Sequence, residues 1–157
     1  MPKAVSENLV LAKFKQLLGP LGVVHSSEEK VVADAAIKNL NIKVQEGGNQ
    51  PAKDLSGGNQ QKVVLGKWLA LEPTMFILDE PTRGVDVGAK FEIYTIIARM
   101  AKQGSTLLMI SSEMEELMGI CDRILVMRKG RITAEVSRGS YDQEVIMQHA
   151  VGGSTTS

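Results

Sequence analysis

A short, unbroken apolar run, Met75–Leu78, lies between Pro73 and Asp79 and narrows the possible folds. A run of this length without polar alternation is typical of a strand buried on both faces of a parallel sheet. A second such run, Thr106–Ile110, follows an amphipathic stretch at 89–103. Since that stretch has helical periodicity, the three segments predict a right-handed unit of strand, helix and strand. The fold class that we expect is therefore α/β.

The sequence before this unit predicts helices. Apolar residues recur at helical spacing from 6 to 18 and again from 27 to 40, where Ser26 is the expected cap. Turn-forming residues without apolar periodicity predict a surface loop at 45–54. A third helix is expected from about residue 56 to residue 72, before the next proline.

The sequence after the second strand predicts a short helix at 113–118. Apolar segments at 124–127 and 132–136 flank the polar turn 128–131, which predicts an antiparallel hairpin on the edge of the sheet. The last predicted helix covers 140–150, with its first residue, a serine, as the cap.

Composition limits the partners and the location. The eighteen basic and eighteen acidic residues of the 157-residue chain cancel, so no overall positive field favours nucleic acid. The single cysteine, Cys121, cannot form an internal disulfide and is typical of a reducing compartment, so we expect a cytoplasmic location. No apolar run reaches the roughly 20 residues that cross a bilayer, and the first residues do not resemble a signal peptide. Membrane association is therefore expected to go through another protein, without direct insertion.

A hydroxyl and two glycines stand where the third helix is expected to begin, in Ser56-Gly57-Gly58-Asn59-Gln60. The free N–H groups of a first helical turn attract anions, and glycine lets a phosphate approach the backbone closely. The Ser56 hydroxyl can add a hydrogen bond. An ordinary helix cap uses the same residue types, so the pattern alone leaves both an anion site and a cap open.

Two adjacent carboxylates, Asp79 and Glu80, follow the first predicted strand. Open α/β sheets present their ligand groups at the carboxyl ends of strands. Asp79 can hold Mg²⁺, usually through water, and Glu80 can polarise a water molecule that attacks a phosphoryl group. Two solvated carboxylates in a turn from strand to helix would give the same pattern, so this alternative also stays open.

These two motifs occur in order with a third, RGVD at 83–86, and together they resemble the ATP-binding cassette (ABC) transporter family. Residues 55–63, LSGGNQQKV, resemble the family's signature motif. Residues 75–82, MFILDEPT, resemble its Walker B strand with the catalytic glutamate, and RGVD resembles its D-loop. The forms look most like the second cassette of sugar importers of the ribose, galactose and xylose type, and the resemblance runs from Val5 to Gly152.

The resemblance implies a partial P-loop NTPase (RecA-like) core with parallel strands and crossover helices, a C-terminal hairpin and an N-terminal helical subdomain. It divides the chain into a helical subdomain at 1–72, the C-terminal part of the core at 73–151 and a disordered tail at 152–157. In the family, two cassettes face head to tail, and ATP with Mg²⁺ lies between the Walker A loop of one and the signature of the other. The implied partners are a second cassette and membrane-embedded permease subunits, at the inner face of the cell membrane.

The implied site draws on four segments of the chain. The signature and the D-loop are implied to contact the nucleotide, and the first Walker B acid is implied to bind Mg²⁺ through water. The second acid and the residue at the switch position are the implied catalytic residues. In this sequence these are Ser56, Gly57, Gly58, Asn59, Gln60 and Asp86 for the nucleotide, Asp79 for Mg²⁺, and Glu80 and Ser112 for catalysis.

Two departures from the family pattern bear on mechanism. The Walker A loop, G-x-x-x-x-G-K-[ST], does not occur in the chain. Because that loop holds the β-phosphate, we expect the chain alone neither to bind ATP tightly nor to hydrolyse it. Ser112 stands where most members have a switch histidine. Its hydroxyl can hydrogen-bond a γ-phosphate but cannot carry a positive charge, and Ser112 is an equally suitable cap for the following helix.

Two functions stay open. The chain is either the helical subdomain and catalytic core of a sugar-importer ATPase, working with a Walker A loop supplied elsewhere, or a non-catalytic interaction module that docks on a partner cassette or permease. In both cases the strands that the family places beside 75–78 are missing, so apolar residues there and at 106–110 should be exposed. We therefore also expect self-association.

Overall fold

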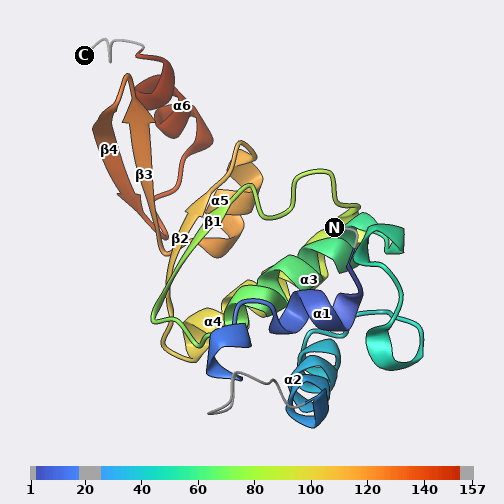
Figure 1. The fold of residues 1–157 in the computed structure, drawn as a ribbon. Coiled ribbons are helices and arrows are strands. Elements are labelled where there is room, and N and C mark those ends of the chain that lie inside the picture. The colour runs from blue at the N-terminus through green and yellow to red at the C-terminus, as the bar shows by residue number, and fades with distance from the viewer. Residues whose placement is uncertain (1–2, 18–25, 153–157) are drawn as a thin grey trace. The chain divides into compact units, whose positions relative to one another are not determined.

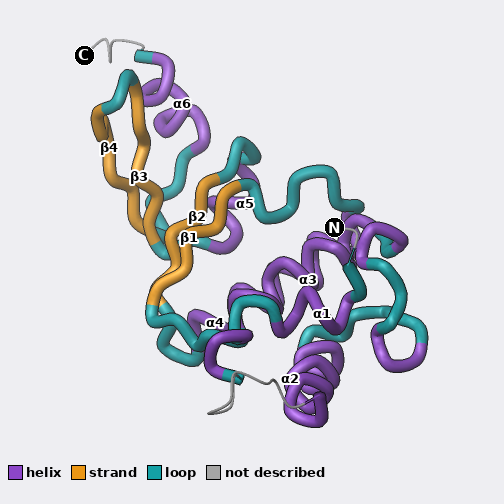
Figure 2. Tube along the Cα trace, in the orientation of Figure 1, coloured by secondary structure: helices purple, strands orange, loops and turns teal. Residues whose placement is uncertain are grey.

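The computed structural model describes residues 3–17 and 26–152, and Figures 1 and 2 trace its elements. The chain divides into two compact units. The first comprises Met1–Ile77 and Pro81–Leu108, and the second comprises Leu78–Glu80 and Met109–Ser157. Three sequence predictions lie outside the described residues: the end of the first helix, the cap at the Ser26 side chain, and the tail from residue 153 on.

The first unit begins with the short helix α1, Val5–Val10, and a 3₁₀ turn, η1, at Phe14–Gln16. The prediction of one helix over 6–18 is therefore wrong. The backbone tightens after α1, where Lys13 N–H donates to Val10 O at 3.0 Å. The side chain of Leu11 is exposed at this point, so no burial stabilises a longer α-helix.

The second helix, α2, spans Ser26–Asn39, close to its predicted range of 27–40. The turn after α1 brings Leu17 into a small apolar cluster with Val10 and with Ala33 of α2. The break in the first predicted helix thus allows the N-terminal segment to fold back and bury apolar surface on α2.

The predicted surface loop at 45–54 contains two short 3₁₀ turns, η2 at Glu46–Gly48 and η3 at Ala52–Asp54. It is fastened to the start of α1, because Val5 N–H donates to Gln50 O at 3.0 Å. Ala52 is fully buried. The segment that leads into the next helix is therefore held in place, although its sequence has the composition of a free loop.

Helices α3, Gly57–Leu69, and α4, Val87–Lys102, form where they are predicted, and they contact each other. The start of α4 is capped by Asp86, whose carboxylate accepts a hydrogen bond from Ala89 N–H at 3.0 Å. The four apolar residues that the periodicity of α4 predicts to face inward are all buried: Ile93, Ile96, Ile97 and Met100.

Strands β1, Met75–Asp79, and β2, Thr106–Ile110, are hydrogen-bonded neighbours. Thr106 N–H donates to Thr74 O and Glu80 N–H donates to Ile110 O, both at 2.9 Å. The two bonds follow the two strands in the same direction, so the pair is parallel. The predicted unit of strand, crossover helix and parallel strand is confirmed.

The prediction that the first strand is buried on both faces is wrong, because burial alternates along β1. Phe76 and Leu78 are buried, whereas Met75 is 52% exposed and Ile77 is 65% exposed. The apolar run therefore reflects two apolar faces of which only one is covered within this chain. The exposure of apolar residues that was expected at these strands is confirmed, and it extends to Leu108 of β2.

The second unit continues with α5, Met114–Ile120, and with strands β3, Arg123–Arg128, and β4, Arg131–Ser137, which pair antiparallel as predicted. The hairpin forms a two-stranded sheet of its own rather than an edge of the β1–β2 sheet. Each of its strands alternates between a face that packs on the last helix and a face that does not, which makes it a separate small layer.

The last helix, α6, spans Gln143–Val151 and buries Ile146 against the hairpin residues Ile124 and Val126. Its cap is Asp142 rather than the predicted serine, because the Asp142 carboxylate accepts from the N–H groups of the second and third residues beyond it. None of the helices in the described part of the chain combines the length and apolar character that crossing a membrane requires.

Candidate functional site

The first group of predicted site residues lies at the start of α3. Ser56 is the N-cap residue, and the first hydrogen bond of the helix runs from Gln60 N–H to Ser56 O at 2.9 Å. The N–H groups of Gly57, Gly58 and Asn59 thus precede the hydrogen-bonded ladder of the helix, and the helix dipole is positive at this end. This is the arrangement that binds anions at helix N-termini.

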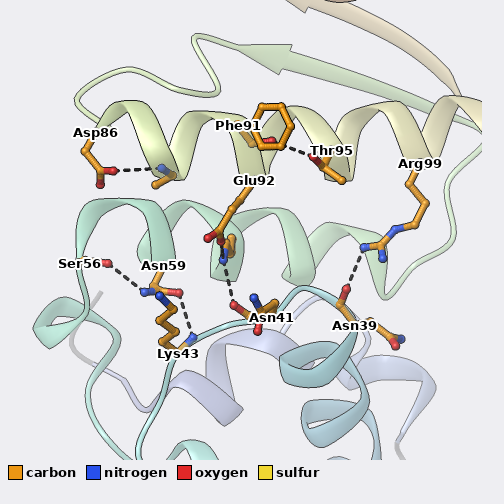
Figure 3. Close-up of polar contacts among 12 residues, drawn as sticks. Asn39, Asn41, Lys43, Ser56, Asn59, Asp86, Phe91, Glu92, Thr95 and Arg99 are labelled. Atoms are coloured by element: carbon orange, nitrogen blue, oxygen red, sulfur yellow. Dashed lines mark hydrogen bonds and ion pairs between the residues drawn. The ribbon is translucent and has the colours of Figure 1, made fainter.

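The side chains of this turn are organised by hydrogen bonds to one another (Figure 3). Asn59 Nδ2 donates to Ser56 Oγ at 2.9 Å, and Asn59 Oδ1 accepts from Lys43 N–H at 2.9 Å. Gln60 Nε2 donates to Leu55 O at 2.9 Å, beneath the turn. Ser56 thus occupies the N-cap position, but its hydroxyl accepts from Asn59 Nδ2 and makes no capping bond to a backbone N–H of α3.

The two glycines have different surroundings. Gly58 is buried, and a Cβ built on it would overlap the Cβ of Ala89 in α4. A Cβ on Gly57 would meet only Gly84 O, at 3.4 Å, which is a tolerable contact. Gly58 is therefore required for the close approach of α3 to α4, whereas Gly57 is the more open of the two.

A cavity of about 270 Å³ opens beside this turn. The Asp86 side chain, which caps α4, contributes to its wall. The turn at Ser56 and Asp86, the last residue of the RGVD segment, thus line one cavity within the first unit. The cavity is lined by Lys43, Ser56, Gly58, Asn59, Lys62, Asp86, Gly88, Ala89 and Glu92.

One functional candidate escaped the sequence analysis. Lys62 on α3 is only 2% exposed, and its ammonium pairs with the Glu92 carboxylate of α4 and donates to Asn41 O at 2.9 Å. Its spacing gives a signal that could have found it, because Lys62 follows Gly58 by four residues and precedes Gly66 by four, on the face of α3 that packs inward.

The second group of predicted site residues lies in the second unit, where β1 ends. Asp79 is exposed and closes the strand. Glu80 has a φ of 48°, an uncommon value for a residue with a side chain and more so before a proline. Its N–H still pairs with Ile110 O of β2, so the chain turns sharply at the acid itself. Backbone strain of this kind is concentrated at functional sites.

Ser112 contributes through its backbone. Its N–H donates to Glu80 Oε1 at 2.8 Å, which fixes the direction of that carboxylate. The alternative role of Ser112 as cap of the next helix is wrong, because the N-cap residue of α5 is Glu113. The neighbouring Ser111 hydroxyl bonds to the buried carboxylate of Glu116 and accepts from Glu113 N–H at 3.0 Å, which orders the turn.

The structure therefore brings the predicted residues together in two groups, one in each unit. Around α3 lie Ser56, Gly57, Gly58, Asn59, Gln60 and Asp86, and at the end of β1 lie Asp79, Glu80 and Ser112. No set of three or more metal-binding side chains clusters among the described residues.

Comparison with known proteins bears directly on these groups. The family model for ABC transporters matches residues 2–83 of this chain, which include the α3 turn and both acids. The ribose import ATP-binding protein RbsA of Geobacillus kaustophilus is 51% identical over 150 residues, which are 96% of this chain and 30% of that protein. The ribose import ATP-binding protein RbsA of Halalkalibacterium halodurans is 48% identical over 150 residues, with the same coverage.

Solved structures of the same family share the fold. The ATP-binding cassette MJ1267 of an ABC transporter superposes with a TM-score of 0.77 at 25% identity, over 96% of this chain and 62% of that one. The dimeric bacterial ABC transporter cassette MJ0796 gives a TM-score of 0.72 at 22% identity, over 90% of this chain and 60% of that one. The second likeness concerns the fold alone.

The chain spans about 30% of the length of the curated relatives that it matches. The match with the family model covers residues 2–83, more than half of the chain. The α/β fold with its parallel strands is that of the ABC ATPases. The chain therefore belongs to the ABC transporter family and comprises part of an ATP-binding cassette.

Proposed function

We propose that this chain supplies the signature motif, the Walker B acids and the D-loop to ATP hydrolysis that drives sugar import, with ribose as the first sugar to test. The observation that carries the proposal is the turn at Ser56, where the N-terminal end of the 13-residue helix α3 opens beside a cavity that Asp86 also lines. The similarity to two ribose import ATP-binding proteins over nearly the whole chain supports the choice of sugar.

In this proposal, Ser56 and the N–H groups of Gly57 and Gly58 bind the γ-phosphate of an ATP molecule that another cassette holds. Three donors at a helix N-terminus stabilise the charge that develops on the phosphoryl group during transfer. Asn59 and Gln60 act mainly by fixing the turn, since their amide groups are bonded to Ser56, to the backbone at Lys43 and to Leu55.

The acids at the end of β1 divide the remaining work. Asp79 is exposed and presents carboxylate oxygens, the ligands that Mg²⁺ prefers, so it fits the metal that accompanies ATP in this family. Bound Mg²⁺ would neutralise phosphate charge. Glu80 orients and deprotonates the attacking water. The Ser112 N–H holds the Glu80 carboxylate in one orientation. Glu80 can therefore still face the attacking water, although Ser112 lacks the charge of the family's histidine.

The wider assembly belongs to the same proposal. Residues 1–72 form the helical subdomain that contacts the permease, and residues 73–151 belong to the ATPase core. The chain works in the cytoplasm at the inner face of the membrane, together with permease subunits and a second cassette. On its own it neither binds ATP tightly nor hydrolyses it, because the β-phosphate lacks its Walker A loop.

The second candidate, a non-catalytic docking module, is favoured by one observation. Met75, Ile77 and Leu108 are exposed on neighbouring strands. Such a face suits burial against another protein surface whether or not the chain takes part in hydrolysis.

A chimera separates the two candidates. In it, this chain replaces the matching 150-residue part of the Geobacillus kaustophilus relative, and ATP turnover is measured with the permease in proteoliposomes. We expect turnover by the chimera and a loss of at least about 100-fold in its Ser56→Arg variant, because the larger cation blocks the phosphate position. A control, Ser140→Arg, lies far along the sequence in an exposed turn and should leave turnover unchanged. An active Ser56→Arg chimera would favour the docking module.

A further inference from the structure

The Lys62 side chain is a buried cation, 2% exposed, on the face of α3 that packs against α4. A buried cation is costly unless its hydrogen bonds and its charge are both satisfied. Here Glu92 supplies the opposite charge and Asn41 O supplies an acceptor at 2.9 Å. Because the Glu92 side chain is 40% exposed, solvent screens the pair and its contribution to stability is modest, so overall stability alone gives a weak reason for a lysine at this position.

The pair joins the two helices that carry the nucleotide-facing segments. Gly58 packs against Ala89 at the first contact between α3 and α4. Lys62 and Glu92 lie one helical turn further along each helix and make the second contact. Two consecutive contacts fix the relative rotation of the helices as well as their separation. The turn at Ser56 and the cap at Asp86 are therefore held in one arrangement.

The bond from Lys62 to Asn41 O completes a series of hydrogen bonds beside the cavity. Lys62 binds the backbone at Asn41, and two residues later the N–H of Lys43 binds Asn59 Oδ1. Asn59 in turn donates to Ser56 Oγ. Figure 3 shows Asn41 and Glu92 facing each other across α3, with Lys43 and Ser56 on either side of Asn59. The Lys62 ammonium thus holds the 41–43 backbone, which holds the Asn59 side chain, and Asn59 in turn donates to the Ser56 hydroxyl.

We propose that Lys62 is a positioning residue for the signature turn, which acts through Glu92 and through the Asn41–Lys43 backbone to keep Ser56 and Asp86 in register. This inference rests on the proposed function. It assigns Lys62 no contact with nucleotide, so its loss should lower kcat and leave the KM for ATP nearly unchanged.

The test uses the chimera described above with Lys62→Met and Glu92→Gln, and with Lys67→Met as the matched control. Lys67 lies on the same helix and stacks on the Trp68 ring, away from the cavity lining. We expect Lys62→Met and Glu92→Gln to lower kcat by about tenfold or more through misplacement of the turn. The conservative variant Lys62→Arg, which keeps a cation for Glu92 and a donor for Asn41 O, should retain most of kcat, and Lys67→Met should change neither kcat nor KM.

Amide hydrogen exchange on the chain itself gives a readout that does not depend on turnover. Lys62→Met and Glu92→Gln should speed exchange of the hydrogen-bonded amides in the first turns of α3, residues 60–65, while the hairpin amides of β3 and β4 keep their rates. A Lys62→Met variant with kcat within about twofold of the parent, or with unchanged exchange at 60–65, would overturn the inference. If the parent chimera is inactive, the proposed function fails, and the exchange result alone decides on Lys62. Glu92→Gln serves both measurements should Lys62→Met not fold.

Discussion

At Gly58 a single hydrogen atom sets the distance between two helices. A Cβ there would overlap the Cβ of Ala89, and the side chain of Val85 lies close by as well. We expect Gly58→Ala to destabilise the chain by about 1–3 kcal/mol, because the overlap forces α3 and α4 apart. Urea denaturation followed by circular dichroism measures the change.

Gly57→Ala is the matched control for this prediction. Its Cβ would meet only Gly84 O at 3.4 Å, so the effect should stay within about 0.5 kcal/mol. Equal losses for the two variants would mean that the glycines serve backbone freedom at the helix start rather than the contact with α4.

The Cys121 thiol should react slowly. Burial raises its pKa above the ordinary value of 9.0, and the neighbouring Asp122 carboxylate adds to the shift while Arg138 opposes it. Since the thiolate is the reactive form, a raised pKa lowers the thiolate fraction at any pH below it. We expect alkylation by iodoacetamide at pH 8 to be slower in the folded chain than in urea, with a folded pH midpoint above 9. A folded midpoint below that of the unfolded chain would contradict this.

Residue identity could be predicted where a motif fixed it. The residues of the α3 turn, Asp86 and the two acids could be named because their motifs resemble those of the ABC transporter family. For Lys62 the sequence holds only a weak signal, its four-residue spacing from Gly58 and Gly66, because lysine on a helix is normally solvated and the sequence does not show that Glu92 lies opposite. The bond from Ser112 N–H to the Glu80 carboxylate could not be predicted either, because a bond between residues 32 positions apart leaves no local sequence pattern.

At the scale of elements, the turn between β3 and β4 is under conformational strain. Lys129 and Gly130 both have positive φ, 48° and 76°, as a two-residue hairpin turn of type I′ requires. Glycine adopts this conformation freely, whereas lysine does so at a cost. We expect Lys129→Asn to stabilise the chain by about 0.5–1 kcal/mol, measured as a higher urea midpoint.

Gly130→Ala provides the opposite test of the same turn. It should destabilise by about 1 kcal/mol, because alanine is disfavoured at positive φ. A destabilising Lys129→Asn would indicate that the lysine side chain contributes a contact worth more than the strain.

Long periodic elements could be predicted well, and short ones less so. The inward face of α4 was correct at every position, because 16 residues give more than four turns of evidence. The predicted first helix is too long, because its apolar spacing continues past Val10, although Phe14 is exposed and Leu17 is buried from a 3₁₀ turn rather than from a continued α-helix. The cap of α6 was placed two residues early, because serine and aspartate are both good caps and only geometry separates them.

At the scale of the whole molecule, the exposed face of the β1–β2 sheet should drive self-association. Met75, Ile77 and Leu108 share this surface, and an apolar strand face invites a second copy of the chain. We expect Ile77→Lys to weaken association by about tenfold or more, as measured by sedimentation velocity. Val87→Lys changes a residue of α4 that is 85% exposed and serves as the control. A parent chain that remains monomeric at all concentrations would contradict the expectation.

Burial on both faces of β1 could not be judged from the sequence. The apolar run is a property of the strand, whereas the burial of each face depends on what packs against it, and in the described structure the face of Phe76 and Leu78 is the covered one. Met75 and Ile77, on the opposite face, therefore remain exposed although their side chains are apolar.

The central claim is that this chain supplies one face of a nucleotide site whose other face lies elsewhere. Calorimetric titration of ATP in the presence of Mg²⁺ tests this claim most directly. ATP is titrated into the chain alone, into a cassette that carries a Walker A loop, and into both together. The account predicts no saturable binding to the chain alone and tighter binding by the cassette when the chain is present, with that gain abolished by Ser56→Arg. Saturable binding by the chain alone, or a gain that Ser56→Arg leaves intact, would contradict it.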